Sequence, residues 1–333
     1  MRLKFWIGII ISAGLLAMMF WWIGFDFRRL WDAVRSIEPW HLVAAAALNL
    51  AIYVIRAVRW RYLMDPVKER VKISHLYSAT MVGFMANNLL PARLGEIVRA
   101  YVIGRREKIP TSSALATLVV ERMFDAFTIL LLLVIVLVYM PKAVSGGNDV
   151  NKIRSAGKYL MIVCPVLIVS ILFLAYKQGL MEKIVNQVFR PFPKLGKKVL
   201  PLVKKFVSGL SVIKNPRLLA PIVFYSGLHW ALLCLPVYII FKGYGLNLGI
   251  YAAAFMLVVI AAAVAVPSTP GYIGTFHAAV AAALMVFGIQ KEQAFAVAIV
   301  LWAMGYIPVT LIGLYCLSRE NLTFSRIKTV EAA

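Results

Sequence analysis

The sequence NNLLPARLGEIVR, residues 87–99, places two asparagines, a proline, two arginines and a glutamate inside a chain that is otherwise mostly apolar. Hydrocarbon satisfies neither an unpaired backbone amide nor a lone charge, so such a stretch at membrane depth must be buried in protein or line a wet cavity. The stretch therefore predicts a helix that is interrupted around Pro91 and Gly95.

A weaker copy of this stretch, PSTPGYIGTFH, occupies residues 267–277. Aligning Pro91 with Pro270 brings Gly95 over Gly274, with a small residue and an aliphatic residue in step between them. Interrupted hydrophobic segments at corresponding positions of two halves are typical of a transporter's binding site. The residues that we expect to break the two helices are Pro91, Gly95, Pro267, Pro270, Gly271 and Gly274.

The composition indicates an all-α polytopic membrane protein. Of the 333 residues, 62% are hydrophobic and 15% are charged, with a mean hydropathy of +0.83, whereas soluble domains are about 45–50% apolar and about 25% charged. The length allows about seven or eight hydrophobic segments in a single transmembrane domain, residues 1–333, and leaves no room for a separate soluble catalytic domain.

The chain carries 36 basic and 14 acidic residues, a net charge of +22. In a membrane protein such an excess collects in cytoplasmic loops beside anionic lipid head groups, so we expect those head groups, and no nucleic acid, as partners. Residues 177–217 hold many of the lysines and arginines, with apolar residues at helical spacing. They are predicted to form amphipathic helices on the cytoplasmic face.

The first two spans are predicted at about residues 5–25 and 41–62. The second ends in Arg56, Arg59 and Arg61 around Trp60. Long basic side chains at a helix end can reach the membrane surface while tryptophan lies at head-group level, so we interpret this group as a cytoplasmic anchor.

The two breaks are predicted to be approached from opposite sides of the membrane. A hydrophobic segment beginning near Ser74 enters from the cytoplasm and meets the first break, whereas the segment 250–266 enters from outside and meets the second. Two re-entrant broken helices of opposite direction form an inverted pseudo-repeat. This topology places both termini in the cytoplasm.

Three motifs resemble a known family: NNLLPARLGE at 87–96 followed by Arg99, VERMFD at 120–125, and PSTPGYIG at 267–274. The chain resembles, over nearly its whole length, the flippase-like integral membrane family that includes the transmembrane region of lysylphosphatidylglycerol synthases. The resemblance implies a bacterial or archaeal inner-membrane protein that handles lipids, with relatives that move an aminoacylated phospholipid between leaflets.

The chain departs from that family in two respects. The soluble aminoacyl-transferring domain of the synthases is absent from this sequence, so synthesis of a modified lipid is not implied. Many relatives have Pro-Gly-Gly and a nearby acid in the second motif, where this chain has Tyr272 and His277. The identity of the lipid therefore does not transfer.

The first break supplies the groups that a lipid head group needs to replace its water. Arg93 or Arg99 can hold a phosphate, Asn87 and Asn88 add polar side chains, and Glu96 can neutralise an arginine or accept an ammonium group. The amides that begin the helix after the break can add dipolar attraction. Alternatively, Arg93 and Glu96 pair only to make the hairpin tolerable in the membrane.

Two further groups are candidates for the site. Glu121 and Asp125 share a helix face and Arg122 lies within three residues of Asp125, so they can form a buried ion cluster, contact the substrate, or do both as a gate. His277 is either a packing residue or a proton carrier that couples transport to protons.

We expect no cofactor, no metal site and no catalytic residue, because the chain has no P-loop and its histidines lack metal-ligand spacing. The favoured function is transport of phospholipid or lipid-linked head groups across the inner membrane. One alternative is an integral membrane transferase with Glu96 or Asp125 as general base. Another is an accessory subunit that recruits a lipid synthase. Partners are thus a lipid substrate, a possible second copy of the chain, or a synthase.

Overall fold

The structure, a computed structural model, describes residues 27–90, 94–139, 187, 215–265 and 269–320. The predicted span at 5–25 lies outside the described residues, as does the basic segment 177–217 apart from Gln187 and residues 215–217. Three of the predicted break and site residues also lie outside them: Pro91, Arg93 and Pro267.

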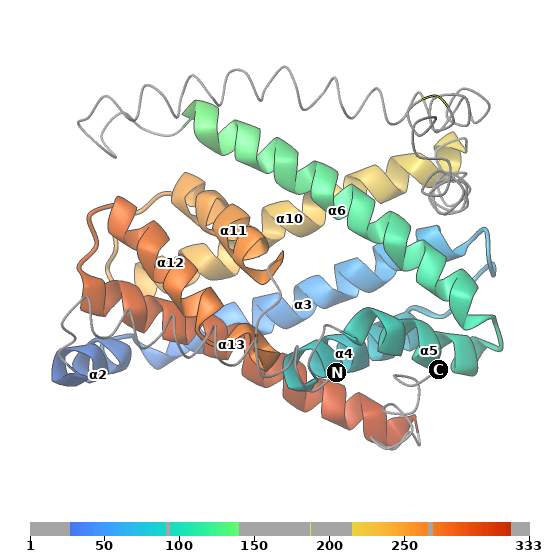
Figure 1. Cartoon of the computed structure of the whole chain (residues 1–333), viewed down its shortest axis with the longest axis horizontal. Coiled ribbons are helices and arrows are strands. Elements are labelled where there is room, and N and C mark those ends of the chain that lie inside the picture. The colour runs from blue at the N-terminus through green and yellow to red at the C-terminus, as the bar shows by residue number, and fades with distance from the viewer. Residues whose placement is uncertain (1–26, 91–93, 140–186, 188–214, 266–268, 321–333) are drawn as a thin grey trace.

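The described residues form helices and no strand, which confirms the all-α prediction for this part of the chain (Figure 1). Three of the helices, α3, α10 and α13, are long and apolar enough to cross a membrane. The elements are α2 (Phe27–Arg35), α3 (Pro39–Met64), α4 (Ile73–Leu89), α5 (Gly95–Glu107), α6 (Thr111–Tyr139), α10 (Pro216–Gly243), α11 (Ile250–Ala265), the 3-10 turn η4 (Pro270–Tyr272), α12 (Thr275–Val286) and α13 (Lys291–Arg319).

The helix boundaries follow local chemistry. Pro39 begins α3, where its missing N–H costs nothing and its fixed φ suits a helix. The side chain of Asn215 caps α10 by accepting from the amide of Arg217 at 3.1 Å. At the C-terminal end of α5, Lys108 adopts a left-handed conformation that ends the helix.

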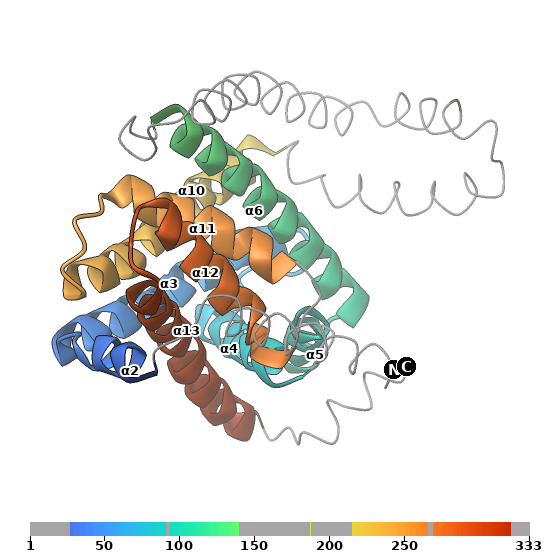
Figure 2. The same cartoon turned by 60° about the vertical axis from the view of Figure 1, so that its left-hand side comes forward.

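The helices α3–α6 and α10–α13 follow one another with similar lengths. They contain 26, 17, 13 and 29 residues in the first half and 28, 16, 12 and 29 in the second. The packing also corresponds when α3, α4 and α6 are matched with α10, α11 and α13. The contact of α4 with α13 then corresponds to that of α11 with α6, and α3 packs against its own counterpart α10. Each helix pair, α4–α5 and α11–α12, lies between α6 and α13, as Figure 2 shows for α11 and α12.

The two short helix pairs approach the middle of the molecule from opposite ends. In Figure 1, α4 and α5 lie on the right and α11 and α12 on the left, and α4 contacts η4 where they meet. Each half has its own apolar core, one around α3–α6 and one around α10–α13, and each core is completed by residues of the other half. The interrupted segments are thus held between long helices.

Candidate functional site

The first break is closed by a short polar contact. The side-chain oxygen of Asn87, near the end of α4, accepts a hydrogen bond from the backbone N–H of Gly95 at 2.8 Å, where α5 begins. Gly83 lets α5 lie directly on α4, because a Cβ there would stand 2.8 Å from the Cβ of Arg99 and 2.8 Å from the carbonyl oxygen of Gly95. This close approach fixes the position from which Arg99 projects.

Asn88 attaches the end of α4 to α13. Its amide nitrogen donates to the hydroxyl of Thr310 at 2.9 Å, and the hydroxyl of Tyr306 donates to the backbone oxygen of Asn88 at 3.4 Å. Both predicted asparagines therefore bond to protein groups around the break.

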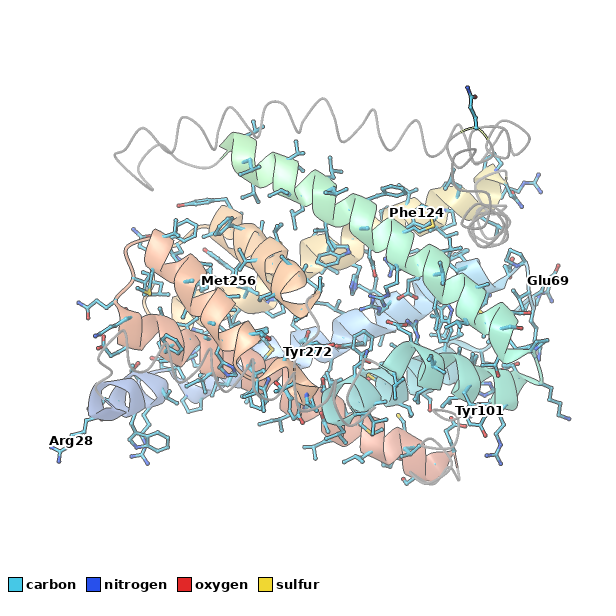
Figure 3. All side chains as sticks on the ribbon, in the orientation of Figure 1. Arg28, Glu69, Tyr101, Phe124, Met256 and Tyr272 are labelled. Atoms are coloured by element: carbon cyan, nitrogen blue, oxygen red, sulfur yellow. The ribbon has the colours of Figure 1, made fainter. Side chains whose placement is uncertain are left out.

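The second break is an irregular turn with three residues in the left-handed region. The φ angles are +69° at Gly271, +58° at Tyr272 and +93° at Gly274, so a helix cannot pass through. The indole N–H of Trp302 donates to the carbonyl oxygen of Gly271 at 2.7 Å. Figure 3 shows Tyr272 near the middle of the molecule, on the short segment that leads into α12.

His277 lies in the first turn of α12. Its Nδ1 accepts from the backbone N–H of Gly274 at 3.4 Å, and its ring lies 5.5 Å from the ring of Trp302. These contacts are those expected if His277 is a packing residue, the first of the two interpretations given for it.

The principal polar feature of the described structure is a buried ion cluster between α3, α5, α6 and α10. One carboxylate oxygen of Glu121, Oε1, contacts four guanidinium groups. The distances are 3.0 Å to Nε of Arg56, 3.3 Å to Nη2 of Arg59, 3.0 Å to Nη1 of Arg99 and 3.1 Å to Nη2 of Arg122.

Asp125, one turn along α6, extends the cluster. Its carboxylate lies 2.7 Å from Nη1 of Arg59, 3.1 Å from Nη2 of Arg56 and 3.2 Å from Nη1 of Arg122. The indole N–H of Trp230 on α10 donates to the same carboxylate at 3.2 Å. Glu121, Arg122 and Asp125 thus come together with Arg99.

The interpretation of Arg56, Arg59 and Trp60 as a surface anchor is wrong. Their exposed fractions are 7%, 0% and 0%. Arg56 lies eight residues before the end of α3, about 12 Å along the helix at 1.5 Å per residue. Its guanidinium therefore pairs with the nearby carboxylates of Glu121 and Asp125 instead of reaching the end of the helix. Trp60 donates to the hydroxyl of Thr117 at 2.9 Å, and its ring lies 3.8 Å from the guanidinium of Arg99.

The cluster opens at one edge. Nη2 of Arg122 lies 3.1 Å from Oε1 of Glu96, and these side chains are 42% and 29% exposed, whereas Glu121 and Arg99 are buried. Over the described residues, the four arginines exceed the three carboxylates Glu96, Glu121 and Asp125 by one positive charge.

Several hydrogen-bonding groups of the cluster have no hydrogen-bond partner among the described residues. They are Nε of Arg59, Nε and Nη2 of Arg99, and one carboxylate oxygen each of Glu96 and Glu121, whereas Nη2 of Arg59 makes only its ion pair of 3.3 Å with Glu121. Unpartnered guanidinium N–H groups at a site with excess positive charge suit a phosphate or a carboxylate, which can accept two parallel bonds.

Sequence reasoning missed the α3 and α10 members of the site. Ser226 accepts from Nη1 of Arg59 at 3.2 Å, and His229 and Trp230 share its helix face. A signal for Arg56 and Arg59 was available: two carboxylates on an apolar helix require buried cations, and Arg122 alone cannot balance Glu121 and Asp125. Nothing in the sequence marks Ser226 or His229. No group of three or more potential metal ligands occurs among the described residues.

Long apolar helices around a largely buried charge cluster define an integral membrane protein of all-helical fold. The chain belongs to the family described as the lysylphosphatidylglycerol synthase TM region, whose sequence profile matches residues 5–313.

Curated relatives include membrane proteins of the group called UPF0104. One from Methanocaldococcus jannaschii is 23% identical over 317 residues, covering 92% of this chain and 91% of the relative. One from Pyrococcus horikoshii is 23% identical over 338 residues, covering 97% and 99%. The glycosyltransferase AglD of Haloferax volcanii is 32% identical over 150 residues, which is 45% of this chain and 24% of AglD. No solved structure matches the chain.

Proposed function

We propose that this protein is a lipid transporter that moves the phosphate-bearing head groups of phospholipids or lipid-linked molecules between the leaflets of the inner membrane. The observation that carries the proposal is the buried arginine cluster, in which Arg59 and Arg99 keep guanidinium N–H groups unpartnered. Burying unpaired hydrogen-bond donors and an excess positive charge is costly. An anionic group that accepts these hydrogen bonds and neutralises the charge is therefore the expected ligand.

The path is formed by two re-entrant helix pairs in an inverted repeat. In this proposal α4–α5 and α11–α12 each enter the membrane and return, and the breaks meet near its midplane. The matching order and lengths of the two halves support the repeat, and so do the packing relations, which are preserved when the halves are exchanged. The described helices, together with the spans predicted outside the described residues, form a single transmembrane domain, residues 1–333, of seven or eight hydrophobic segments.

The charge distribution supports one orientation. Lys68, Arg105, Arg106 and Arg319 lie where α3, α5 and α13 end, and positive charge favours the cytoplasmic side. We assign both termini and the amphipathic segment 177–217 to that side, where they contact anionic lipid head groups.

Head-group entry begins at the exposed edge of the cluster. A lipid phosphate can replace Glu96 beside Arg122 and then reach the unpartnered donors of Arg59 and Arg99, exchanging one set of charged hydrogen bonds for another. The free oxygen of Glu96 can accept the ammonium of an amine-bearing head group.

The test is leaflet exchange of a fluorescent phospholipid in reconstituted vesicles. Replacing Arg99 by methionine removes two unpartnered donors and a charge. We expect exchange to slow about tenfold or more, since a charged hydrogen bond contributes about 1.5–3 kcal/mol. Arg105→Met, an exposed arginine on the same helix, is the matched control and should exchange as wild type. Equal rates in both variants would remove the cluster from the transport path.

A second candidate is the membrane part of a lipid-modifying transferase, or an accessory subunit of a lipid synthase. It is favoured by the similarity to AglD, whose name is that of a glycosyltransferase. Product formed from a donor substrate with no exchange of any lipid would support the transferase. Exchange by the protein alone, without a partner enzyme, would support the transporter.

A further inference from the structure

We propose that His229 contacts the anion bound by the arginine cluster and takes up a proton when that anion is a dianionic phosphomonoester. The inference rests on the proposed anion site and adds the class of lipid that it selects.

The face of α10 places His229 beside the cluster. Ser226, three residues before it, accepts from Nη1 of Arg59, and Trp230, the next residue, donates to Asp125. His229 and Trp230 lie three and four residues after Ser226, so each shares a helix face with Ser226, and the imidazole lies one turn from a side chain that contacts the cluster. The residue is 3% exposed, and its ring lies 6.0 Å from that of Trp230, edge to face.

The imidazole is incompletely satisfied. Nδ1 of His229 has no hydrogen-bond partner among the described residues, although it is buried, and leaving a buried polar atom unpaired is costly. Unpartnered N–H groups of Arg59 and Arg99 belong to the same cluster. A ligand oxygen that reaches them can also receive a hydrogen bond from a protonated His229.

Burial and the charges that face His229 together determine its protonation. Arg56 and Arg59 act on it from α3, and Glu121 and Asp125 from α6. Neither α11 nor the central part of α13 carries a charged residue, since those of α13 lie near its ends. The described cluster has one excess positive charge, so a proton on His229 would add a second. The imidazole is therefore neutral while the site is empty.

The ligand changes this balance. A phosphodiester carries one negative charge and neutralises the cluster with His229 neutral. A phosphomonoester has two negative charges, and the cluster neutralises only one of them. The imidazole balances the second by taking up a proton from water. No covalent bond changes. Monoester binding thus consumes one proton and diester binding consumes none.

The experiment compares two short-chain probes of equal acyl length, dihexanoylphosphatidic acid and dihexanoylphosphatidylglycerol, which are a phosphomonoester and a phosphodiester. Each is titrated into the purified full-length protein at pH 8 by calorimetry, in buffers of different ionisation enthalpy, which counts the protons exchanged. We expect wild type to take up about one proton with the monoester and about none with the diester. His229→Asn should take up none with either probe.

Diester binding is the internal control for folding. His229→Asn should still bind the diester, weakened by no more than about tenfold, because His229 is neutral in that complex and a neutral hydrogen bond contributes about 0.5–1.5 kcal/mol. His41→Asn, at a buried histidine fifteen residues before Arg56 on α3, is the matched control and should keep the proton uptake with the monoester.

Three outcomes would overturn the inference. Proton uptake retained by His229→Asn would place the proton on the phosphate, and loss of diester binding in that variant would make His229 a structural residue. Either result leaves the anion site standing. Binding of neither probe by wild type would remove the anion site and the proposed function with it.

Discussion

The buried cluster makes the effect of Glu121→Gln calculable. Glu121 is fully buried, and one of its oxygens contacts four arginines at 3.0–3.3 Å. The substitution keeps the side-chain shape but raises the excess charge of the cluster from one to two. Removing one partner of a buried ion pair costs about 3–5 kcal/mol, because the other charge stays buried. We expect a loss of this size in the free energy of unfolding, measured by equilibrium denaturation in mixed micelles.

A second substitution separates stability from function. Arg99→Met combined with Glu121→Gln restores the original excess charge with side chains of similar size, and neutral replacement of a buried pair is often tolerated. The double variant should regain most of the lost stability while its lipid exchange stays slow. Glu69→Gln, at an exposed position, is the control. A Glu121→Gln protein within about 0.5 kcal/mol of wild type, the range of ordinary surface changes, would refute the reasoning.

Three smaller predictions concern the frame of the site. Gly83→Ala should destabilise by about 1–3 kcal/mol because its Cβ meets α5, whereas Gly227→Ala, with nothing within 4 Å, should not; thermal unfolding compares them. Lys108→Gly should stabilise by about 1 kcal/mol by relieving the left-handed backbone of this exposed residue at the end of α5; a lower unfolding temperature would contradict this. Burial is the largest single effect on the pKa of Glu107 and raises it, but the hydrogen bonds and charges of Lys68 and His75 together lower it overall. Its stabilisation is therefore complete above the unfolded pKa of about 4.3 and is lost as pH falls through the folded pKa. Glu107→Gln should flatten the acid side of the stability profile, and an unchanged profile would count against that role.

Hydrophobic runs predicted much of the fold. Because a helix must satisfy its own backbone in lipid, long apolar stretches could be assigned as helices, and α3 agrees with the span predicted at 41–62 within a few residues. The breaks were marked by proline, glycine and charge, and α4 and α5 are separated where Pro91 and Gly95 indicated. How the spans pack could not be predicted, since helix contacts depend on small residues such as Gly313, whose partners Met81 and Met85 are far away in sequence.

The site was predicted in part for a related reason. Glu121 and Asp125 attract attention because a carboxylate in an apolar helix needs a partner. Arg56 and Arg59 can be interpreted either as surface anchors or as partners of buried carboxylates. Only the tertiary structure decides between the two. Ser226 and His229 are unremarkable residues on an apolar helix, and only the packing of α10 against α3 brings them to the cluster.

The most direct test of the central claim is an experimental structure of the protein in lipid nanodiscs that locates the phosphates of bound lipids. A phosphate within about 3 Å of the guanidinium nitrogens of Arg59 or Arg99 is the predicted result, since charged N–H···O bonds have about that length. Phosphates confined to the two bilayer surfaces, with the ion cluster closed by protein alone, would contradict it.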